Sequence, residues 1–148
     1  MIGLLQRVNE ARVDVEGETV GAIGAGLMVL IGVQRNDTQR EADRLLERLI
    51  SYRVFEDDTG RMNRSVTDIN GELLLVPQFT LPADTRKGTR PSFTPAAAPD
   101  VATSLFDYLV ERACAQQLTV QTGRFGAYMQ VSLINDGPVT FWLEVTPQ

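Results

Sequence analysis

The residues best suited to chemistry follow the apolar run Leu73–Val76, where a buried strand would leave the core. Gln78 and Thr80 flank Phe79 at this point, so an amide and a hydroxyl stand on either side of an aromatic ring. Loops at the ends of rigid strands are where proteins often present polar groups to a ligand. We therefore expect a ligand pocket at this strand end, lined by Gln78, Phe79 and Thr80.

Three roles are open to Thr80: lining a pocket, filling a strand position that suits its β-branched side chain, or acting as a nucleophile. A hydroxyl nucleophile needs an adjacent base, and the chain contains no histidine. The absence of histidine also excludes the Ser-His-Asp and Cys-His arrangements and removes the commonest metal ligand. Proton transfer must then come from a carboxylate, a lysine, water or the substrate. We rank pocket lining first for Thr80, a structural role second and the nucleophile third.

A second concentration of turn residues and polar side chains lies at Asn135–Thr140, and we expect it to form one site with the first. Its Gly137-Pro138 step is either an ordinary turn or a cis peptide, and only a minority of X-Pro bonds are cis. Between the two motifs, Arg86, Lys87 and Arg90 form a short basic loop. Such a cluster is either a solvated loop or a local contact surface for RNA.

Composition indicates one globular domain spanning residues 1–148, long enough to bury a core without disulfides. The single cysteine, Cys114, excludes an internal disulfide and a cysteine-rich zinc site, and we expect it to be a small buried apolar residue. The net charge of −5 argues against a protein that coats nucleic acid. The longest apolar run, Leu27–Ile31, is too short to span a bilayer. A cytoplasmic chain with no cofactor, no metal, no membrane contact and no DNA partner is expected.

Hydrophobic periodicity predicts the order βββ-α-ββ-α-βββ. The first two strands form a hairpin that turns at Glu16-Gly17, and Thr38 with Glu41 forms a capping box at the first helix. Asp100 is expected to cap the second helix, and Asn135–Pro138 to turn the chain between the last two strands. These elements predict a single α+β domain with a mostly antiparallel or mixed, barrel-like sheet covered by two helices.

The two motifs together resemble those of the D-aminoacyl-tRNA deacylase family. Pro77-Gln78-Phe79-Thr80-Leu81 is similar to that family's Ser-Gln-Phe-Thr-Leu motif, and Asn135–Thr140 is similar to its Asn-x-Gly-Pro motif. The opening Met1–Val15, the lead-in Gly71–Val76 and the tail Lys87–Phe93 fit as well. The resemblance therefore covers essentially the whole chain.

The resemblance implies a homodimer, without metal, whose pocket lies at the subunit interface. Gly137 and Pro138, joined by a cis bond in the family, would reach with Asn135 into the partner's pocket and exclude L-aminoacyl groups by main-chain contacts. Gln78 and its neighbours would hold the terminal adenosine and the amino-acid ester. The implied activity is hydrolysis of the ester of D-aminoacyl-tRNA, and of glycyl-tRNA, with help from the substrate's ribose 2′-hydroxyl.

Further implications concern the basic loop and one departure from the family motif. Arg86, Lys87 and Arg90 are expected to hold the acceptor end of tRNA. Pro77 stands where the family has serine, which removes a hydroxyl and a backbone donor together, and proline also favours an edge strand. Two alternatives remain: a non-catalytic module that binds an RNA end or an amino-acid-like ligand, and a hydrolase with Thr80 as nucleophile.

Overall fold

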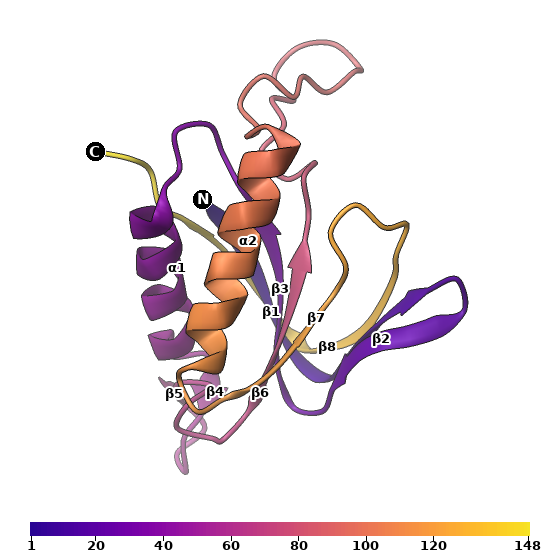
Figure 1. The fold of residues 1–148 in the computed structure, drawn as a ribbon. Helices are drawn as coiled ribbons and strands as arrows, with labels where there is room; N and C mark the ends of the chain where they lie inside the picture. Colours follow the sequence, from indigo (N-terminus) through magenta and orange to yellow (C-terminus); the bar gives the residue numbers. More distant parts are fainter.

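The computed structural model describes residues 1–148, which form eight strands and two helices (Figure 1). In chain order the elements are β1 (Ile2–Val15), β2 (Glu18–Ile23), β3 (Gly26–Gly32), α1 (Gln39–Ser51), β4 (Phe55–Glu56), β5 (Met62–Arg64), β6 (Glu72–Pro77), α2 (Pro99–Cys114), β7 (Thr119–Thr122) and β8 (Gln130–Glu144). The short strands β4 and β5 pair only with each other, and the other six strands form one sheet.

The long strand β1 organises the main sheet. One edge of β1 pairs antiparallel with β8 from Ile2 to Asp14. The other edge pairs antiparallel with β3 over Ile2–Val8 and with β2 over Ala11–Val15. The predicted hairpin is present, and its turn residues Glu16 and Gly17 both have positive φ.

The sheet is mixed and curls into a nearly closed barrel. β6 runs parallel to both β3 and β7, which explains the continuous apolar sequences of β3 and β6, since strands inside parallel sheets are covered on both faces. The two edge strands of the sheet order, β2 and β7, approach each other closely. A β-carbon added at Gly21 of β2 would lie only 2.5 Å from the carbonyl oxygen of Thr122 in β7. The predicted α+β class with a barrel-like mixed sheet and two helices is confirmed.

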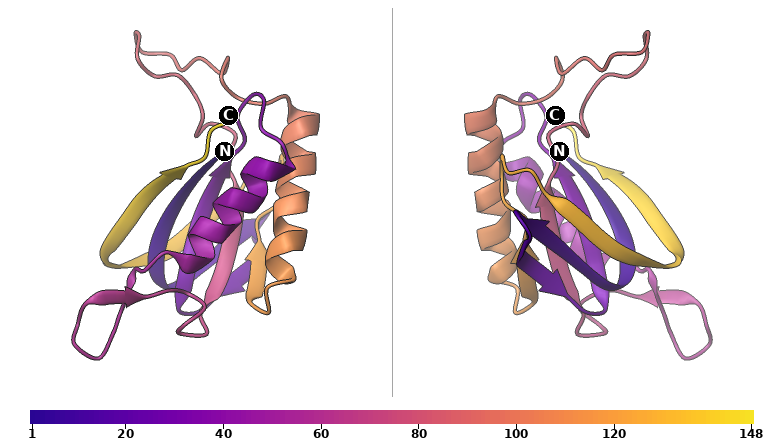
Figure 2. Two further views of the ribbon diagram at one scale, coloured as in Figure 1. Left: turned by 90° about the vertical axis from the view of Figure 1, so that its left-hand side faces the viewer. Right: turned by 90° about the vertical axis from the view of Figure 1, so that its right-hand side faces the viewer.

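Helix α1 begins with the predicted capping box. The backbone N–H of Arg40 donates to the Thr38 hydroxyl (3.3 Å), and the backbone N–H of Thr38 donates to the Glu41 carboxylate (2.7 Å). Two backbone donors of the first turn are therefore satisfied by side chains. The helix lies beside α2, and both cover the same face of the sheet (Figure 2).

Helix α2 starts differently from the prediction. Pro99 occupies the first turn, and the preceding residue Ala98 is extended and makes no capping hydrogen bond. Asp100 lies inside the first turn, so the prediction that it caps the helix is wrong. Proline suits this position because it has no N–H to satisfy and its φ is already helical.

Strand β8 corrects a second prediction. Residues 130–144 form one strand along β1, and no turn separates two strands at Asn135–Pro138. Val8 pairs with Asn135 while Gln6 pairs with Thr140, so the four residues 136–139 lie opposite Arg7 alone. The turn residues therefore form an extended bulge that leaves the direction of the strand unchanged.

Two apolar clusters form the core. The larger lies between the sheet and the helices and includes Leu45, Leu75 and Leu109, and the smaller packs Met28 against residues of the strand hairpin inside the curl of the sheet. Cys114 is exposed, so the prediction of a buried cysteine is wrong. Neither helix is long and apolar enough to cross a membrane.

Candidate active site

The first predicted motif stands where β6 ends and a long loop begins. This loop, residues 78–98, projects beyond the ends of the strands (Figures 1 and 2). Pro77 is the last residue of β6 and is buried in a central strand, which corrects the expectation of an edge strand. The proline is tolerated because β7 pairs only with Glu72–Leu75, so no partner on that side needs its missing N–H.

Gln78, Phe79 and Thr80 lie in a tight turn directly after β6. The backbone N–H of Gln78 donates to the Ile31 carbonyl of β3 (2.8 Å), which fixes the turn to the sheet. The Gln78 side-chain amide donates to the Thr80 hydroxyl. The Phe79 ring is 63% exposed, with its centroid 5.5 Å from that of Phe93. The rigid scaffold thus presents a ring, an amide and a hydroxyl together.

The same turn exposes backbone donors. The backbone N–H of Leu81 donates to the Gln78 carbonyl (3.2 Å), which closes the turn. The N–H groups of Phe79 and Thr80, inside the turn, donate no hydrogen bond within the chain. Adjacent N–H groups with free capacity are suited to stabilising negative charge on a ligand oxygen.

An apolar pocket opens beside this turn. It has a volume of about 810 Å³, and Phe79, Phe93 and Phe125 contribute to its walls together with Pro77. Gln78 lines a small adjoining cavity that shares Phe79 and Phe125 with the pocket. Phe125 and the loop between β3 and α1, which contributes Arg35 and Asn36, were missed by the sequence reasoning. The only sequence signal for Phe125 is its place between two glycines, Gly123 and Gly126, which reads equally well as a break in a strand.

The surroundings of Thr80 disfavour a nucleophilic role. The only hydrogen bond of its hydroxyl is with the Gln78 amide, which acts as the donor and cannot accept a proton. The nearest acid in sequence, Asp84, bonds Arg86 and pairs its backbone with Ser92. No group of three or more potential metal-ligating side chains occurs in the chain. The geometry thus argues against the nucleophile, and Thr80 itself is not among the residues that line the pocket or the adjoining cavity.

Within the basic loop, Arg86 differs from the other two cations. Its guanidinium forms two 2.9 Å hydrogen bonds with the two carboxylate oxygens of Asp84. Hydrogen bonds from the Arg86 side chain and then from its backbone N–H lower the pKa of Asp84 to about 2. Lys87 and Arg90 are exposed and take part in no ion pair. Lys87 and Arg90 are therefore freer to meet an anionic ligand than Arg86.

This contact makes a pH-dependent prediction. The pKa of Asp84 in the folded chain lies below its ordinary value of 3.8, so the contact is complete above that pH and is lost as the pH falls through about 2. We expect carbon-detected NMR to show the Asp84 carboxyl titrating near 2 in the wild type and closer to 3.8 in Arg86→Gln. A wild-type midpoint near 3.8 would contradict the bidentate contact.

The second predicted motif forms the bulge of β8. The Asn135 amide donates to the Thr140 hydroxyl (2.8 Å), and its carbonyl oxygen accepts from the backbone N–H of Val139 (3.0 Å). These bonds close the base of the bulge. The Gly137-Pro138 bond at its tip is cis, and both residues are exposed.

The buried residue Arg7 supports this bulge from the neighbouring strand β1. Its Nε donates to the Asp136 carbonyl (3.0 Å), and its Nη1 donates to the Val54 carbonyl (2.8 Å). Gly137 has φ +131°, and a β-carbon there would lie 2.8 Å from Val139 Cγ2 and 3.1 Å from Arg7 Nη2. Only glycine fits this position without displacement. The sequence held no signal for Arg7. The alternation of polar and apolar residues along the first strand predicts only an ordinary strand residue at this position.

The chain does not bring its two motifs into one pocket. The cavities at the end of β6 are lined by residues before, in and after the loop 78–98, and Asn135–Thr140 contributes to none of them. The expectation of one site is therefore not met within a single chain.

Comparison with solved structures defines the class of the fold. A structure described as "c-Myc DNA Unwinding Element Binding Protein" superposes with a TM-score of 0.94 and 39% identity, and the match covers 99% of this chain and 100% of that one. A structure described as a probable eukaryotic D-amino acid tRNA deacylase superposes with a TM-score of 0.80 at 19% identity, covering 97% and 98% of the two chains. The chain therefore has the fold of both of these proteins along its whole length.

Sequence comparison identifies the family. The family model described as D-Tyr-tRNA(Tyr) deacylase matches residues 4–144, and the chain belongs to this family of hydrolases. The D-aminoacyl-tRNA deacylase of Thioalkalivibrio sulfidiphilus is 67% identical over 147 residues, covering 99% of each chain. The deacylase of Shigella dysenteriae is 58% identical over 145 residues, covering 98% of this chain and 100% of the relative. The family predicted from the two motifs is confirmed.

Proposed function

We propose that this protein hydrolyses the ester bond of D-aminoacyl-tRNA and releases a free D-amino acid and tRNA. The observation that carries the proposal is the pair of free backbone N–H groups of Phe79 and Thr80 beside an open aromatic pocket. Family membership supplies the substrate class. The pocket suits an adenosine base and an amino-acid side chain, since its walls are largely apolar and aromatic.

In the proposed reaction, water attacks the ester carbonyl carbon and the bond to the ribose oxygen breaks. The N–H groups of Phe79 and Thr80 stabilise the negative charge that develops on the carbonyl oxygen. Gln78 positions the substrate through its amide, and the 2′-hydroxyl of the substrate ribose assists proton transfer to the leaving oxygen. This division of roles requires no histidine and no protein nucleophile, because the ester is already reactive and positioning supplies much of the rate.

Chiral selection in this proposal belongs to the bulge of β8. Gly137 and Pro138, held by Asn135, enter the pocket of a partner subunit and leave no room for the side chain of an L-aminoacyl group. Glycyl-tRNA is accepted as well, because glycine has no side chain to reject. Selection by main-chain atoms suits the task, since a wall of main-chain atoms cannot change rotamer to admit the wrong enantiomer.

The homodimer in this proposal is supported by the exposed face of β8. This strand pairs only with β1, so its other edge is open. Large apolar side chains on it are exposed: Val131, Ile134 (51%), Phe141 and Trp142 (50%). Several large exposed apolar side chains on one open edge strand favour an interaction site, and that strand carries the Gly137-Pro138 bulge. Each subunit, residues 1–148, is proposed to act as one deacylase domain.

A shared site makes a prediction for mixed dimers. Gly137→Ala and Gln78→Ala should each be inactive, because each damages both sites of its own homodimer. After subunit exchange, half of the dimers are mixed and each has one intact site, so about a quarter of wild-type activity should return. The measurement is hydrolysis of D-tyrosyl-tRNA by the mixture. No recovery after exchange verified by mass spectrometry would mean that each site is built within one chain.

Multiple turnover separates this proposal from the non-catalytic binding module. With D-tyrosyl-tRNA in large excess over protein, we expect many ester bonds to be cleaved for each protein molecule, with intact tRNA and free D-tyrosine as products. Binding of the tRNA without loss of the ester would favour the binding module. In that outcome the first variant to test would be Pro77→Ser, which restores the serine of the family motif.

A further inference from the structure

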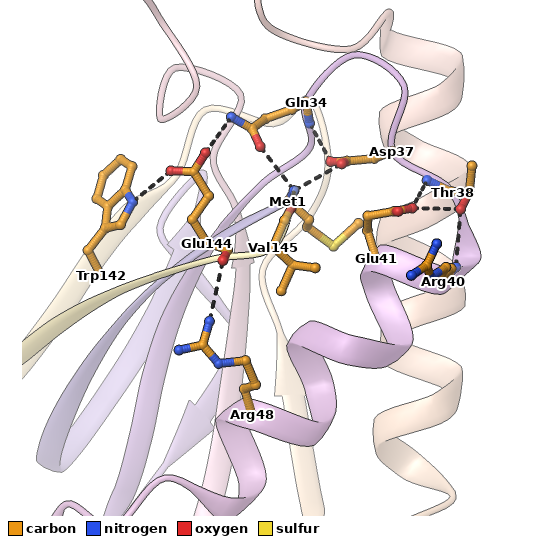
Figure 3. Close-up of polar contacts among 10 residues, drawn as sticks. All are labelled: Met1, Gln34, Asp37, Thr38, Arg40, Glu41, Arg48, Trp142, Glu144 and Val145. Carbon is orange, nitrogen blue, oxygen red and sulfur yellow. Dashed lines mark hydrogen bonds and ion pairs between the residues drawn. The ribbon is translucent and has the colours of Figure 1, made fainter. Parts of the chain in front are cut away.

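The loop between β3 and α1 is held rigidly at the mouth of the pocket. The α-amino group of Met1 donates to Asp37 Oδ1 (2.9 Å) and to Gln34 Oε1 (3.0 Å), and the Met1 and Asp37 side chains are fully buried (Figure 3). Asp37 Oδ2 also accepts the backbone N–H of Gln34 (2.7 Å). Gln34 and Asp37, on either side of Arg35 and Asn36, are therefore fixed by buried or partly buried polar contacts, which hold their geometry better than exposed ones.

Arg35 lies inside this loop. Its backbone N–H donates to the Pro95 carbonyl (2.9 Å), and its neighbour Gln34 forms a bridge with Ala96 on the far side of the long loop. The Arg35 side chain is exposed and makes no hydrogen bond or ion pair with the rest of the chain. The structure thus fixes the backbone of Arg35 and leaves its guanidinium free.

The charge of Arg35 is isolated in the pocket. Of the 13 residues that line the cavity, Arg35 is the only charged one, and eight are hydrophobic. The protein as a whole carries a net charge of −5, whereas the only charge in the lining of this pocket is positive. A ligand that matches this pocket has an apolar or aromatic body and one negatively charged group at its edge.

We propose that Arg35 is a substrate-binding residue that contacts the phosphate joining the terminal adenosine to the rest of the tRNA. The inference rests on the proposed function, which places that adenosine in the pocket. The aromatic walls receive the base and sugar, and the first phosphate then lies at the rim, where a guanidinium can bond two of its oxygens. Arg35 thus adds binding energy for the substrate at the rim of the pocket, away from the ester that reacts at Phe79 and Thr80.

The other cations fit this role less well. Arg86 is already bonded to Asp84 through both carboxylate oxygens, so a phosphate would have to displace that partner. Lys87 and Arg90 are free, but neither lines the pocket. They are placed to meet more distant phosphates of the acceptor end, whereas Arg35 meets the first.

The decisive experiment compares two esters of the same amino acid. D-Tyrosyl-tRNA carries the phosphate, and D-tyrosyl-adenosine lacks it. For Arg35→Gln we expect KM for D-tyrosyl-tRNA to rise by about 10-fold or more with little change in kcat, since a charge-assisted hydrogen bond is lost. The kinetic constants for D-tyrosyl-adenosine should remain those of the wild type. Arg35→Lys should recover part of the loss, because it keeps the charge and loses the bidentate geometry.

The dependence of KM on salt concentration distinguishes a phosphate contact from a merely structural role, which would leave this dependence unchanged. Loss of one phosphate contact should lower the slope of log KM against log salt concentration by about 0.7 for a single-stranded end. Arg61→Gln is the matched control: it removes the same charge from an exposed arginine in the β4–β5 turn, at the end of the molecule opposite the long loop. Its kinetics with both esters should equal those of the wild type.

Equal losses with both esters in Arg35→Gln, or no loss with either, would overturn the role of Arg35. Failure of the wild type to cleave either ester is a different result, because it would overturn the proposed function itself. Thermal unfolding of Arg35→Gln is expected to match the wild type, since the substituted side chain is exposed and makes no hydrogen bond or ion pair within the chain.

Discussion

Phe79→Ala is expected to lower kcat/KM for D-tyrosyl-tRNA by about 10- to 100-fold while the protein stays folded. The ring is largely exposed and meets only Phe93 among the aromatic rings, so its removal leaves no cavity in the core. Its place in the pocket wall suits it to stack on the terminal base, and base–aromatic stacking contributes about 1–3 kcal/mol. The measurement is steady-state hydrolysis, with circular dichroism to verify folding.

Phe79→Tyr is the matched control for this prediction. Tyrosine keeps the aromatic ring and adds a hydroxyl at an exposed position, so activity should stay within a few-fold of the wild type. Wild-type kinetics in Phe79→Ala would show that the ring does not contact the substrate. The pocket beside β6 would then no longer be proposed as the binding site for the terminal adenosine.

Gly26→Ala is expected to destabilise the fold by about 3 kcal/mol or more, a large part of the stability of a small domain. Gly26 pairs with Glu72 where β3 and β6 run side by side. A β-carbon at Gly26 would lie 1.9 Å from the Glu72 carbonyl oxygen and 2.6 Å from its backbone nitrogen. Backbone atoms cannot move away as a flexible side chain can. The methyl group would therefore force β3 and β6 apart at the first residue of β6, the strand that leads to the site.

Gly24→Ala tests the same argument two residues away. Its β-carbon would meet only the Glu72 side-chain oxygen at 3.3 Å, and that carboxylate can rotate. We expect urea unfolding to give Gly24→Ala a free energy of unfolding within about 1 kcal/mol of the wild type. Equal stability of the Gly26→Ala protein and the wild type would contradict the close approach of β3 and β6.

Much of the fold could be predicted because local signals agreed with tertiary structure. The unbroken apolar runs of β3 and β6 indicate strands covered on both faces, and both strands lie in the parallel part of the sheet. Thr38 and Glu41 form the capping box that their spacing predicts. These features depend on neighbours within a few residues, which a sequence displays directly.

The errors arose where a tertiary partner decides the conformation. Asn135–Pro138 has the composition of a turn, yet pairing with β1 on both sides makes it a bulge within one strand. Pro77 suggests an edge, yet the shorter partner β7 allows proline at the end of a central strand. Arg35 carries no sequence signal of function, because its place at the pocket follows from its bond to Pro95 and from the pairing of Gln34 with Ala96, about 60 residues further along.

The most direct test of the central claim is the hydrolysis of D-tyrosyl-tRNA measured beside that of L-tyrosyl-tRNA, with EDTA present. We expect rapid loss of the D-ester while the L-ester decays only at its spontaneous rate. Equal cleavage of both esters would leave a hydrolase without the chiral selection assigned to Gly137 and Pro138. If neither ester were cleaved faster than in buffer, the deacylase function proposed for this protein would be wrong.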